Sequence, residues 1–395
     1  MSVAPARTAT PLDGAAGAAF VLLLFVLPGP IAPMGIATAL CGVLTLACFV
    51  RAPRPQWPHT PVTLAGWGWF AALLLAALTA YDRSASLPRI TKGLMPILVS
   101  LAAFHAAEQR RGERALAAFL VASGLVAAAG LALWVQHGAS FASRARGLSG
   151  HYMTFAGQLL LEVPVALGVA LLARSPRWRA GAAITAVLGV AALVVTFTRS
   201  AWIGLFVAGG VLLGAVLPLG LLALAALAVA AYLFAPGTFR ERIHSAFDPT
   251  HPWNRERVHM WDAGLRMFRD HPVTGVGLQD MHELYDRYRS ADSVERAGHL
   301  HNVFVQIAAS MGAVGLAAFA WLYAALLWTA AAGLKPLLHQ RGLAAGLKLG
   351  VVAALAGFIV AGCFEWNFGD EELLYPLYLL VGLAWGARDW EERGA

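Results

Sequence analysis

Histidine, arginine and acidic residues concentrate in one segment of the chain, residues 249–315. This segment holds six of the twelve histidines. It ends where the stretch His299-Leu300-His301-Asn302 enters a long apolar run. Imidazole is the usual general base near neutral pH, and Arg guanidinium groups bind phosphate oxygens in pairs. The segment therefore indicates acid–base chemistry beside an anionic, phosphate-bearing substrate.

His301 is the candidate base, because it stands at the start of a predicted long helix over 303–328. The positive end of the helix dipole disfavours a protonated imidazole, so His301 would stay neutral and ready to accept a proton. A base of this kind would deprotonate an attacking hydroxyl. The alternative is a helix-start histidine that only faces water, and the residues alone leave both interpretations open.

The cations that could accompany His301 come from several parts of the chain. Arg257 lies within the histidine-rich segment, and Arg199 lies between two apolar spans with almost no loop around it. A charge placed like Arg199 must face a cavity or a partner, since an unpaired charge in a membrane is costly. Other cations on the same predicted face either converge on the site or extend to lipid headgroups. These are Arg83, Arg89, Lys92, Arg144 and Arg146.

A lipid-linked diphosphate is the natural ligand for such a group of cations. Its tail would stay in the bilayer, and its diphosphate would leave more readily once neutralised by Arg. The polar loops contain no HExxH, Cys pair or Asp-x-Asp, which are common metal-binding patterns. His299 and His301 would point about 200° apart on a helix. No metal and no other cofactor is therefore expected.

The composition is that of an all-α polytopic membrane protein. Hydrophobic residues make up 59% of the chain and charged residues 13%, against about 25% charged in soluble domains. The net charge of +7 does not indicate nucleic-acid binding, because membrane proteins use basic loops for orientation. Twelve windows are apolar enough to form transmembrane helices. They are 14–29, 31–50, 62–80, 94–108, 115–136, 153–173, 179–197, 200–215, 217–235, 303–328, 343–364 and 373–388.

The distribution of basic residues predicts the orientation of these helices. With both termini cytoplasmic, the cytoplasmic loops are basic, as the positive-inside rule requires. These are 51–55, 108–114, 174–179, 335–341 and the tail from Arg388. The opposite, periplasmic face then carries a large loop between helices 9 and 10, with amphipathic helices over 254–269 and 279–289. The apolar stripe of the first helix is predicted from the helical spacing of Val258, Trp261, Leu265 and Phe268. The expected organisation is helices 1–9 (1–235), this loop (236–301), and helices 10–12 with a short tail (302–395).

Glu162, beside Pro164, is an acid within one predicted span. It is interpreted as a buried, hydrogen-bonded acid or a residue near a span boundary. A proton-coupled transporter, which would place several ionisable residues in mid-span, is disfavoured. A transporter of a lipid-linked anion stays open as an alternative.

Several motifs resemble those of a known family. His301-Asn302, nine residues, Gly312, two residues and Gly315 resemble the His-[Asn/Ser]-x9-Gly-x2-Gly pattern of bacterial O-antigen ligases. Thr198-Arg199-Ser200 is similar to the Ser/Thr-Arg element of the same family. A run upstream of His301 resembles the wider family that includes O-antigen polymerases and pilin-type oligosaccharyltransferases. It comprises Arg257, Trp261, Asp270-His271-Pro272 and Gly275-Val276-Gly277.

The resemblance implies a GT-C type membrane glycosyltransferase in the bacterial inner membrane, with its active site facing the periplasm. Its activity would be metal-independent, inverting transfer of O-antigen glycan from undecaprenyl diphosphate to a sugar hydroxyl of lipid A–core. His301 would be the base or would orient the acceptor, and Arg199 and Arg257 would bind the diphosphate. An O-antigen or polysaccharide polymerase is the alternative within the family.

Other residues receive weaker assignments. His299 has no clear counterpart in the family pattern. The acidic cluster at 370–372 either caps a helix N-terminus or binds the acceptor. The remaining candidates for substrate binding are Arg146, Arg89, Lys92, Arg83 and Asn302.

Overall fold

The computed structural model describes residues 10–50, 55–217 and 219–390. Most of the basic loop 51–55, the turn at Pro218 and the end of the C-terminal tail lie outside these ranges. The described chain is helical, and no strand occurs in it. The first half contains α1 (Pro11–Val26), α2 (Ile31–Val50), α3 (Pro61–Leu78), α4 (Arg83–Ser86), η1 (Leu87–Leu94), α5 (Ile97–Ala106), α6 (Gln109–Gln136), α7 (Tyr152–Leu172) and α8 (Pro176–Val194).

The second half begins with the helices that lead into the histidine-rich segment. They are α9 (Arg199–Val216), α10 (Gly220–Phe234), α11 (Gly237–Phe247), α12 (Pro252–Asp270) and α13 (Met281–Tyr288). The remaining helices are α14 (Val303–Ala331), α15 (Leu334–Gln340), α16 (Leu343–Gly362) and α17 (Glu371–Gly386), with short 3-10 turns η2 (Asn367–Gly369) and η3 (Ala387–Asp389).

Each of the twelve predicted windows contains a helix. Nine helices in the described ranges are long and apolar enough to cross a membrane. By contrast, α1, α10 and α17 are shorter, with 16, 15 and 16 residues. A bilayer core requires about 20 residues of helix for a perpendicular crossing. The chain is therefore an all-helical membrane protein with at least these nine candidate spans.

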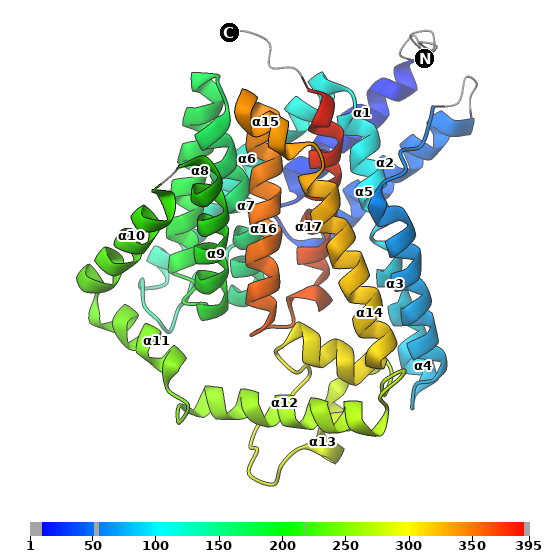
Figure 1. Ribbon diagram of the computed structural model, residues 1–395, viewed down its shortest axis with the longest axis vertical. Coiled ribbons are helices and arrows are strands. Elements are labelled where there is room, and N and C mark those ends of the chain that lie inside the picture. Colours follow the sequence, from blue (N-terminus) through cyan, green and yellow to red (C-terminus); the bar gives the residue numbers. More distant parts are fainter. Residues whose placement is uncertain (1–9, 51–54, 218, 391–395) are drawn as a thin grey trace.

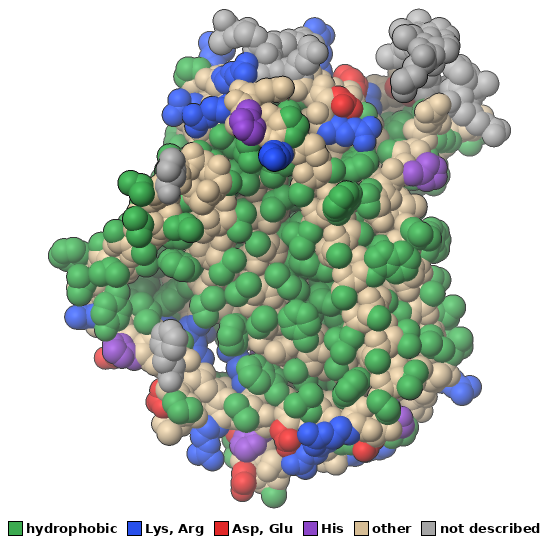
Figure 2. Space-filling model, viewed as in Figure 1, with side chains coloured by type: hydrophobic (Ala, Val, Ile, Leu, Met, Phe, Trp, Pro, Cys, Tyr) green, Lys and Arg blue, Asp and Glu red, His purple; other side chains and the backbone are tan. Residues whose placement is uncertain are grey.

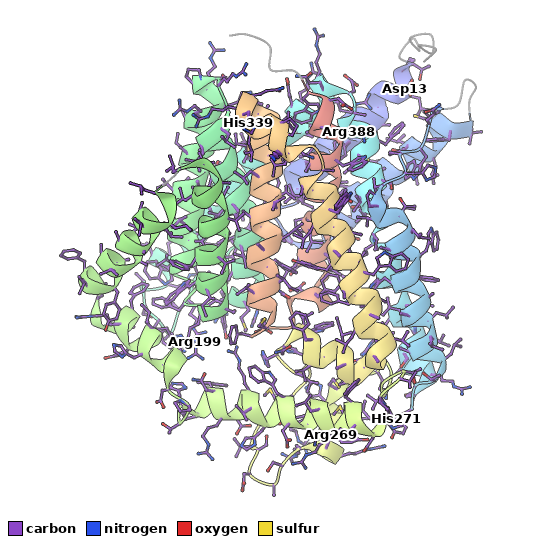
Figure 3. The ribbon with its side chains drawn as sticks, in the orientation of Figure 1. Asp13, Arg199, Arg269, His271, His339 and Arg388 are labelled. Atoms are coloured by element: carbon purple, nitrogen blue, oxygen red, sulfur yellow. The ribbon has the colours of Figure 1, made fainter. Side chains whose placement is uncertain are left out.

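The polar residues gather at the two ends of the helical bundle. Figure 2 shows a wide belt of hydrophobic and uncharged side chains across the middle of one face, with charged side chains toward both ends. Asp13, His339 and Arg388 lie at the end that carries α15, and Arg199 and His271 lie at the opposite end, which carries α12 (Figure 3). These ends are called the α15 end and the α12 end below.

The centre of the bundle is built from closely approaching helices. Gly346 and Gly350 of α16 face Gly168 of α7, and Gly357 of α16 faces Gly204 of α9. Small residues of this kind let transmembrane helices approach backbone to backbone. Glu162 of α7 is buried, in agreement with its interpretation as a buried acid. Lys348 of α16 is also fully buried and donates to the Ala384 carbonyl at 3.0 Å, a span residue that sequence analysis missed.

The amphipathic helices predicted over 254–269 and 279–289 correspond to α12 and α13. In Figure 1, α12 lies across the end of the bundle rather than along it. Its buried face contains Met260, Ala263 and Met267, which pack with residues of α13 and the loop before α14. The apolar stripe predicted from sequence is buried only in part, because Trp261 packs against this cluster whereas Val258 and Leu265 are exposed. The apolar face predicted from sequence therefore differs from the buried face of α12, and the buried face, which carries the methionines, packs on the protein.

The segment 272–277 is inserted beside a kink in α14. The kink lies at Gly312, whose φ is +62°. Backbone N–H groups of Val276 and Gly277 donate to the carbonyls of Ala309 and Ser310 at 2.9 and 3.0 Å. A side chain on Gly275 would clash with the α14 backbone, so the two chains can approach this closely only with glycine there. The family-like glycines thus lock the loop to α14, just beyond its first turns.

Candidate active site

His301 is held in a fixed conformation immediately before α14. Its φ is +47°, a left-handed conformation that costs a non-glycine residue about 1–3 kcal/mol and is often found at functional sites. Asn302 is the N-cap of α14, and its side-chain oxygen accepts hydrogen bonds from Phe304 N and Val305 N. Its side-chain nitrogen donates to the Cys363 carbonyl at 2.8 Å. Asn302 therefore fastens His301 to the segment that follows α16.

That segment supplies a carboxylate partner for His301. Nδ1 of His301 lies 3.0 Å from Glu365. The Glu365 carboxylate also accepts the Trp366 N–H at 3.0 Å, which fixes its orientation. An ionised carboxylate can only accept hydrogen bonds, so the facing Nδ1 carries the hydrogen and Nε2 carries the lone pair. This tautomer is the one that a general base at Nε2 requires.

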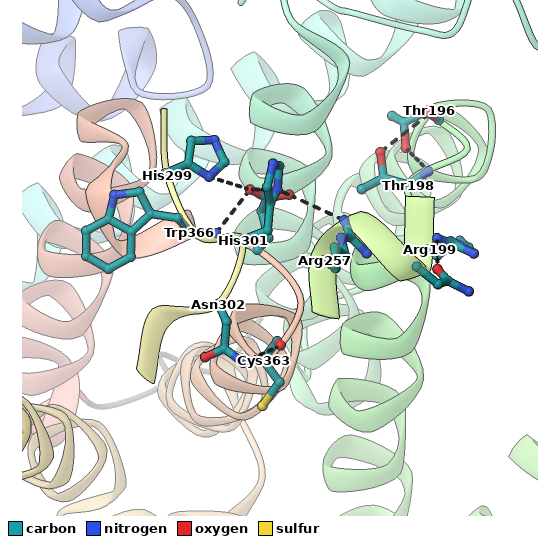
Figure 4. A network of polar contacts seen from close by, with 11 residues as sticks. Thr196, Thr198, Arg199, Arg257, His299, His301, Asn302, Cys363 and Trp366 are labelled. Carbon is teal, nitrogen blue, oxygen red and sulfur yellow. Dashed lines mark hydrogen bonds and ion pairs between the residues drawn. The ribbon is translucent and has the colours of Figure 1, made fainter. Parts of the chain in front are cut away.

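The surroundings of Glu365 keep it ionised. Burial raises the pKa of Glu365, but the hydrogen bond from His301 and the nearby positive charge outweigh burial, and the pKa lies below its usual value. Arg257 contributes to this effect with Nη2 at 3.8 Å from the carboxylate. His299 lies on the other side, and Figure 4 shows His301 between His299 and Arg257. Burial and the neighbouring His301 lower the pKa of His299 to about 4, so His299 is neutral at pH 7.

A cavity of about 170 Å³ opens beside His301 at the α12 end. Four arginines line it together with His301, and they come from the loop before α7 and from α9, α11 and α12. These arginines are Arg144, Arg199, Arg242 and Arg257. It is called the arginine cavity below. Glu256 and Glu295 also line this cavity. The four cations outnumber these two carboxylates, so the arginine cavity is suited to an anionic ligand.

Protein contacts hold the arginines of this cavity in place. Arg199 donates to the Ser245 carbonyl at 2.6 Å and to Asn254 Oδ1 at 2.9 Å, and so ties α9 to α11 and α12. The Arg144 guanidinium stacks 4.3 Å from the Phe141 ring centroid and 4.4 Å from that of Tyr152. Such stacking keeps the planar guanidinium oriented while its N–H edges stay available.

Arg242 shows the electrostatic strain of the cavity most clearly. Burial and the neighbouring cations, chiefly Arg199 and Arg144, lower the pKa of Arg242 to about 10. Its Nε donates to the Phe197 carbonyl at 3.3 Å. A diphosphate placed among these side chains would remove the repulsion and gain charge-assisted hydrogen bonds.

The predicted site residues divide into groups in the structure. His301, Arg199 and Arg257 share the arginine cavity. Arg89 and Lys92 line a different cavity, described below. Arg83, at the start of α4, and Arg146 are exposed and do not line the arginine cavity. Both ends of the Asn302 amide are engaged by the backbone, which gives that residue a structural part in placing His301.

Two residues at the site were not selected from the sequence. Glu365 is one of several acidic residues after α16. The sequence does not indicate its pairing with His301, because 64 positions separate the two residues. Arg242 lies in α11, and its only sequence signal was membership of the polar segment that follows α10. A stronger signal could have come from the rule that charges beside apolar spans need partners.

The acidic residue next to the two histidines also creates a possible metal site. One ligand atom each of His299, His301 and Glu365 lies within 4.8 Å of the others. The two histidines precede α14 in non-helical backbone, so the helical geometry that argued against chelation does not apply. Arg257, beside the Glu365 carboxylate, opposes a bound cation. The donor set fits a divalent metal by residue type, and its electrostatic surroundings fit an anion better.

One comparison with known proteins matches the same part of the chain. A family model described as O-antigen ligase matches residues 184–320. This match includes Arg199, Arg242, Arg257 and His301 of the arginine cavity, whereas Arg144 and Glu365 lie outside it. No curated protein matches the chain. Residues 184–320 are therefore similar to the family described as O-antigen ligase, which is consistent with the superfamily of O-antigen ligases and polymerases.

Proposed function

We propose that this protein is an O-antigen ligase, which transfers a glycan from undecaprenyl diphosphate to a sugar hydroxyl of lipid A–core. The observation that carries the proposal is the meeting of His301 and four arginines in one cavity. The arginines suit a diphosphate, and the Glu365-paired imidazole suits a base. A reaction that joins a hydroxyl to a carbon bearing a diphosphate needs both of these elements.

In the proposed reaction, His301 Nε2 accepts the proton of the acceptor hydroxyl. The hydroxyl oxygen then attacks the anomeric carbon of the donor, and the bond from that carbon to the diphosphate oxygen breaks. The electron pair leaves with the diphosphate, and attack from the opposite side inverts the configuration. Glu365 stabilises the imidazolium that forms, as a carboxylate does for a catalytic histidine.

Arg144, Arg199, Arg242 and Arg257 contribute by stabilising charge on the leaving diphosphate. Their N–H groups are already held in place by the protein, so little reorganisation is needed as the charge develops. General-base catalysis of this kind typically accelerates a reaction by about 10²–10⁴-fold. The reaction scheme requires no metal, because the arginines take the part that a divalent ion would have on the diphosphate.

The membrane setting supports the same proposal. The loops 108–114, 174–179 and 335–341 lie at the α15 end, which the positive-inside rule assigns to the cytoplasm. The arginine cavity at the α12 end would then face the periplasm of the bacterial inner membrane. A polyprenyl tail could remain in the bilayer while its diphosphate occupies the cavity. The large segment 236–301 would be a periplasmic loop covering the site.

The pattern of lipopolysaccharide in cells that lack the protein tests the proposal. Loss of a ligase leaves bare lipid A–core, with polymer retained on the undecaprenyl carrier. Loss of a polymerase leaves single repeat units on lipid A–core. The second pattern would replace the proposed ligase by a polymerase, and an unchanged pattern would exclude both activities.

A further inference from the structure

A second, larger cavity has His299 in its wall. Its volume is about 390 Å³, and it is bounded by α3, η1, α14, η2, α17 and the loop 278–281. Its apolar wall includes Trp69, Trp366 and Phe368. Its charged residues are the cations Arg89 and Lys92 and one carboxylate, Asp280, and Gln279 adds an amide. It is called the tryptophan cavity below. Its wall of flat aromatic surfaces with few charges is the usual composition of an organic ligand site.

A third cavity of about 260 Å³ shares wall residues with both. It shares His299 and Trp366 with the tryptophan cavity. It shares Thr198 and Ser200 with the arginine cavity, and Glu365 forms part of its wall. The three cavities therefore adjoin one another, with the His301–Glu365 pair beside their middle.

The cations of the tryptophan cavity are fastened to the protein. Lys92 Nζ donates to the Gly369 carbonyl at 2.8 Å and lies 3.4 Å from Glu371 Oε1. Arg89 donates through Nη1 to the Leu278 carbonyl. Its Nε and Nη2 have no hydrogen-bond partner among residues 10–50, 55–217 and 219–390. Arg89 thus presents an oriented guanidinium edge with unused donors.

His299 marks the boundary between the cavities and is incompletely bonded. Its Nδ1 is buried without a hydrogen-bond partner in the described chain, since Glu365 Oε1 is 3.8 Å away. Buried polar atoms are nearly always paired, so an unpaired one beside two cavities indicates a missing partner. A hydroxyl of a bound sugar at this boundary would supply that partner.

We propose that the tryptophan cavity binds the acceptor, as the anionic sugar head of a membrane-anchored glycolipid. The proposal rests on the proposed transferase function. Arg89 and Lys92 would bind a phosphate or carboxylate of the acceptor, and Trp69 and Trp366 would contact its sugar rings. His299 would orient the acceptor hydroxyl toward His301. The cations predicted from sequence then serve two substrates, with the arginine cavity reserved for the donor diphosphate.

Steady-state kinetics on the purified full-length protein test this division. The substrates are an undecaprenyl-diphosphate-linked glycan and lipid A–core, and the variants are Arg89→Gln and Lys92→Met. Each variant should raise the KM for acceptor about tenfold, the value of one charge-assisted hydrogen bond. The KM for donor and kcat at saturating acceptor should stay within about twofold. Arg287→Gln, on the exposed surface of α13, is the matched control and should change none of these values.

An acceptor stripped of its phosphates and carboxylates separates recognition of charge from a general structural effect. The KM of the wild-type protein for this stripped acceptor should be about as high as the KM of Arg89→Gln for the charged acceptor. With the stripped acceptor, Arg89→Gln should raise the KM little further. An unchanged acceptor KM in both variants would overturn the proposal, as would an equal rise in the KM for donor. Inhibition by a second undecaprenyl-diphosphate-linked glycan, competitive with acceptor and lost in Arg89→Gln, would assign the anionic head to a carrier-linked glycan instead.

Direct binding keeps the two proposals distinguishable. If the wild-type protein transfers no glycan, the transferase function fails, and binding of lipid A–core is then measured by quenching of tryptophan fluorescence. Saturable quenching that weakens about tenfold in Arg89→Gln but not in Arg287→Gln would support the tryptophan cavity as a glycolipid site. Identical binding by all three proteins would exclude it.

Discussion

Glu365 lies 3.0 Å from Nδ1 of His301, although the two residues are 64 positions apart and belong to segments on either side of two transmembrane helices. Asn302 joins the same two segments through the Cys363 carbonyl. The start of α14 and the end of α16 are thus tied together beside the His301 imidazole. This connection fixes both the position of the ring and its tautomer.

Replacing Glu365 by Gln should lower kcat about 10²-fold while leaving the KM for the donor nearly unchanged. The amide preserves the shape of the side chain, but it cannot stabilise an imidazolium and can present an N–H to Nδ1. The measurement is transfer of labelled glycan at saturating acceptor. Glu283→Gln, an exposed change on α13, is the control. A kcat within threefold of wild type would remove Glu365 from the mechanism.

Replacing Arg242 by Gln should weaken donor binding about tenfold. The guanidinium is one of four facing the arginine cavity, and loss of one charge-assisted hydrogen bond has about this effect. Binding of an undecaprenyl-diphosphate donor to the purified protein checks the prediction. Arg240→Gln is a matched control on the same helix, because Arg240 is exposed. Equal donor affinity in both variants would mean that Arg242 has no part in binding.

His299 should not contribute an ionisation to the activity profile between pH 5 and 8. Its pKa in the folded protein is about 4, so the ring is neutral throughout that interval. The variant His299→Asn should therefore show a profile of the same shape, whatever its absolute rate. Disappearance of an acid limb near pH 6 in this variant would contradict the assignment of a neutral His299.

The same pKa shift has a consequence for stability, because the pKa of an unfolded histidine is about 6.5. At a pH between these two pKa values, His299 is mostly neutral in the folded protein and mostly protonated in the unfolded chain. The contribution of His299 is therefore fully present above pH 6.5 and is lost as the pH falls from 6.5 toward 4. The fall in unfolding temperature over that interval should be smaller in His299→Asn than in wild type.

Gly275→Ala should destabilise the protein by about 2 kcal/mol or more, and loss of correctly inserted protein is the expected extreme. Gly275 has a φ of +68°, and a methyl group would clash with the backbone of α14 at Ser310 and Met311. Strain of this kind typically costs about 1–3 kcal/mol before the clash is added. Thermal unfolding in detergent measures the effect.

Gly181→Ala in α8 provides the control for this change. A methyl group at Gly181 would meet no atom within 4 Å, and alanine favours helix over glycine by about 1 kcal/mol. The control should therefore unfold at the same temperature as wild type or a higher one. If Gly275→Ala behaves in the same way, the locking of segment 272–277 to α14 is not as tight as the contacts indicate.

The parts of this structure that follow local rules could be predicted from the sequence. Apolar runs of about 20 residues become helices because every backbone group must be bonded within the bilayer. His301 was recognisable because it follows a polar loop and precedes a long apolar helix. Arg199 was recognisable because a charge between two spans needs a partner. Each inference used only neighbouring residues.

Pairings across the bundle could not be obtained in this way. Glu365 contacts His301 only because the start of α14 lies beside the end of α16, and neither segment of the sequence indicates that contact. Arg89 and Lys92 were grouped with Arg199 because all three lie on one predicted face, yet the structure puts them in separate cavities. The face of α12 was misjudged because Met260 and Met267 pack inward while Val258 does not.

The most direct test of the account is transfer of labelled glycan from undecaprenyl diphosphate to lipid A–core by purified wild-type and His301→Gln proteins. Both substrates are saturating, EDTA is present, and donor binding is measured in parallel. The account predicts that wild type transfers glycan under these conditions, and that His301→Gln binds the donor normally but transfers it at least about 10²-fold more slowly. Transfer by His301→Gln within threefold of the wild-type rate would contradict the assignment of His301 as the base.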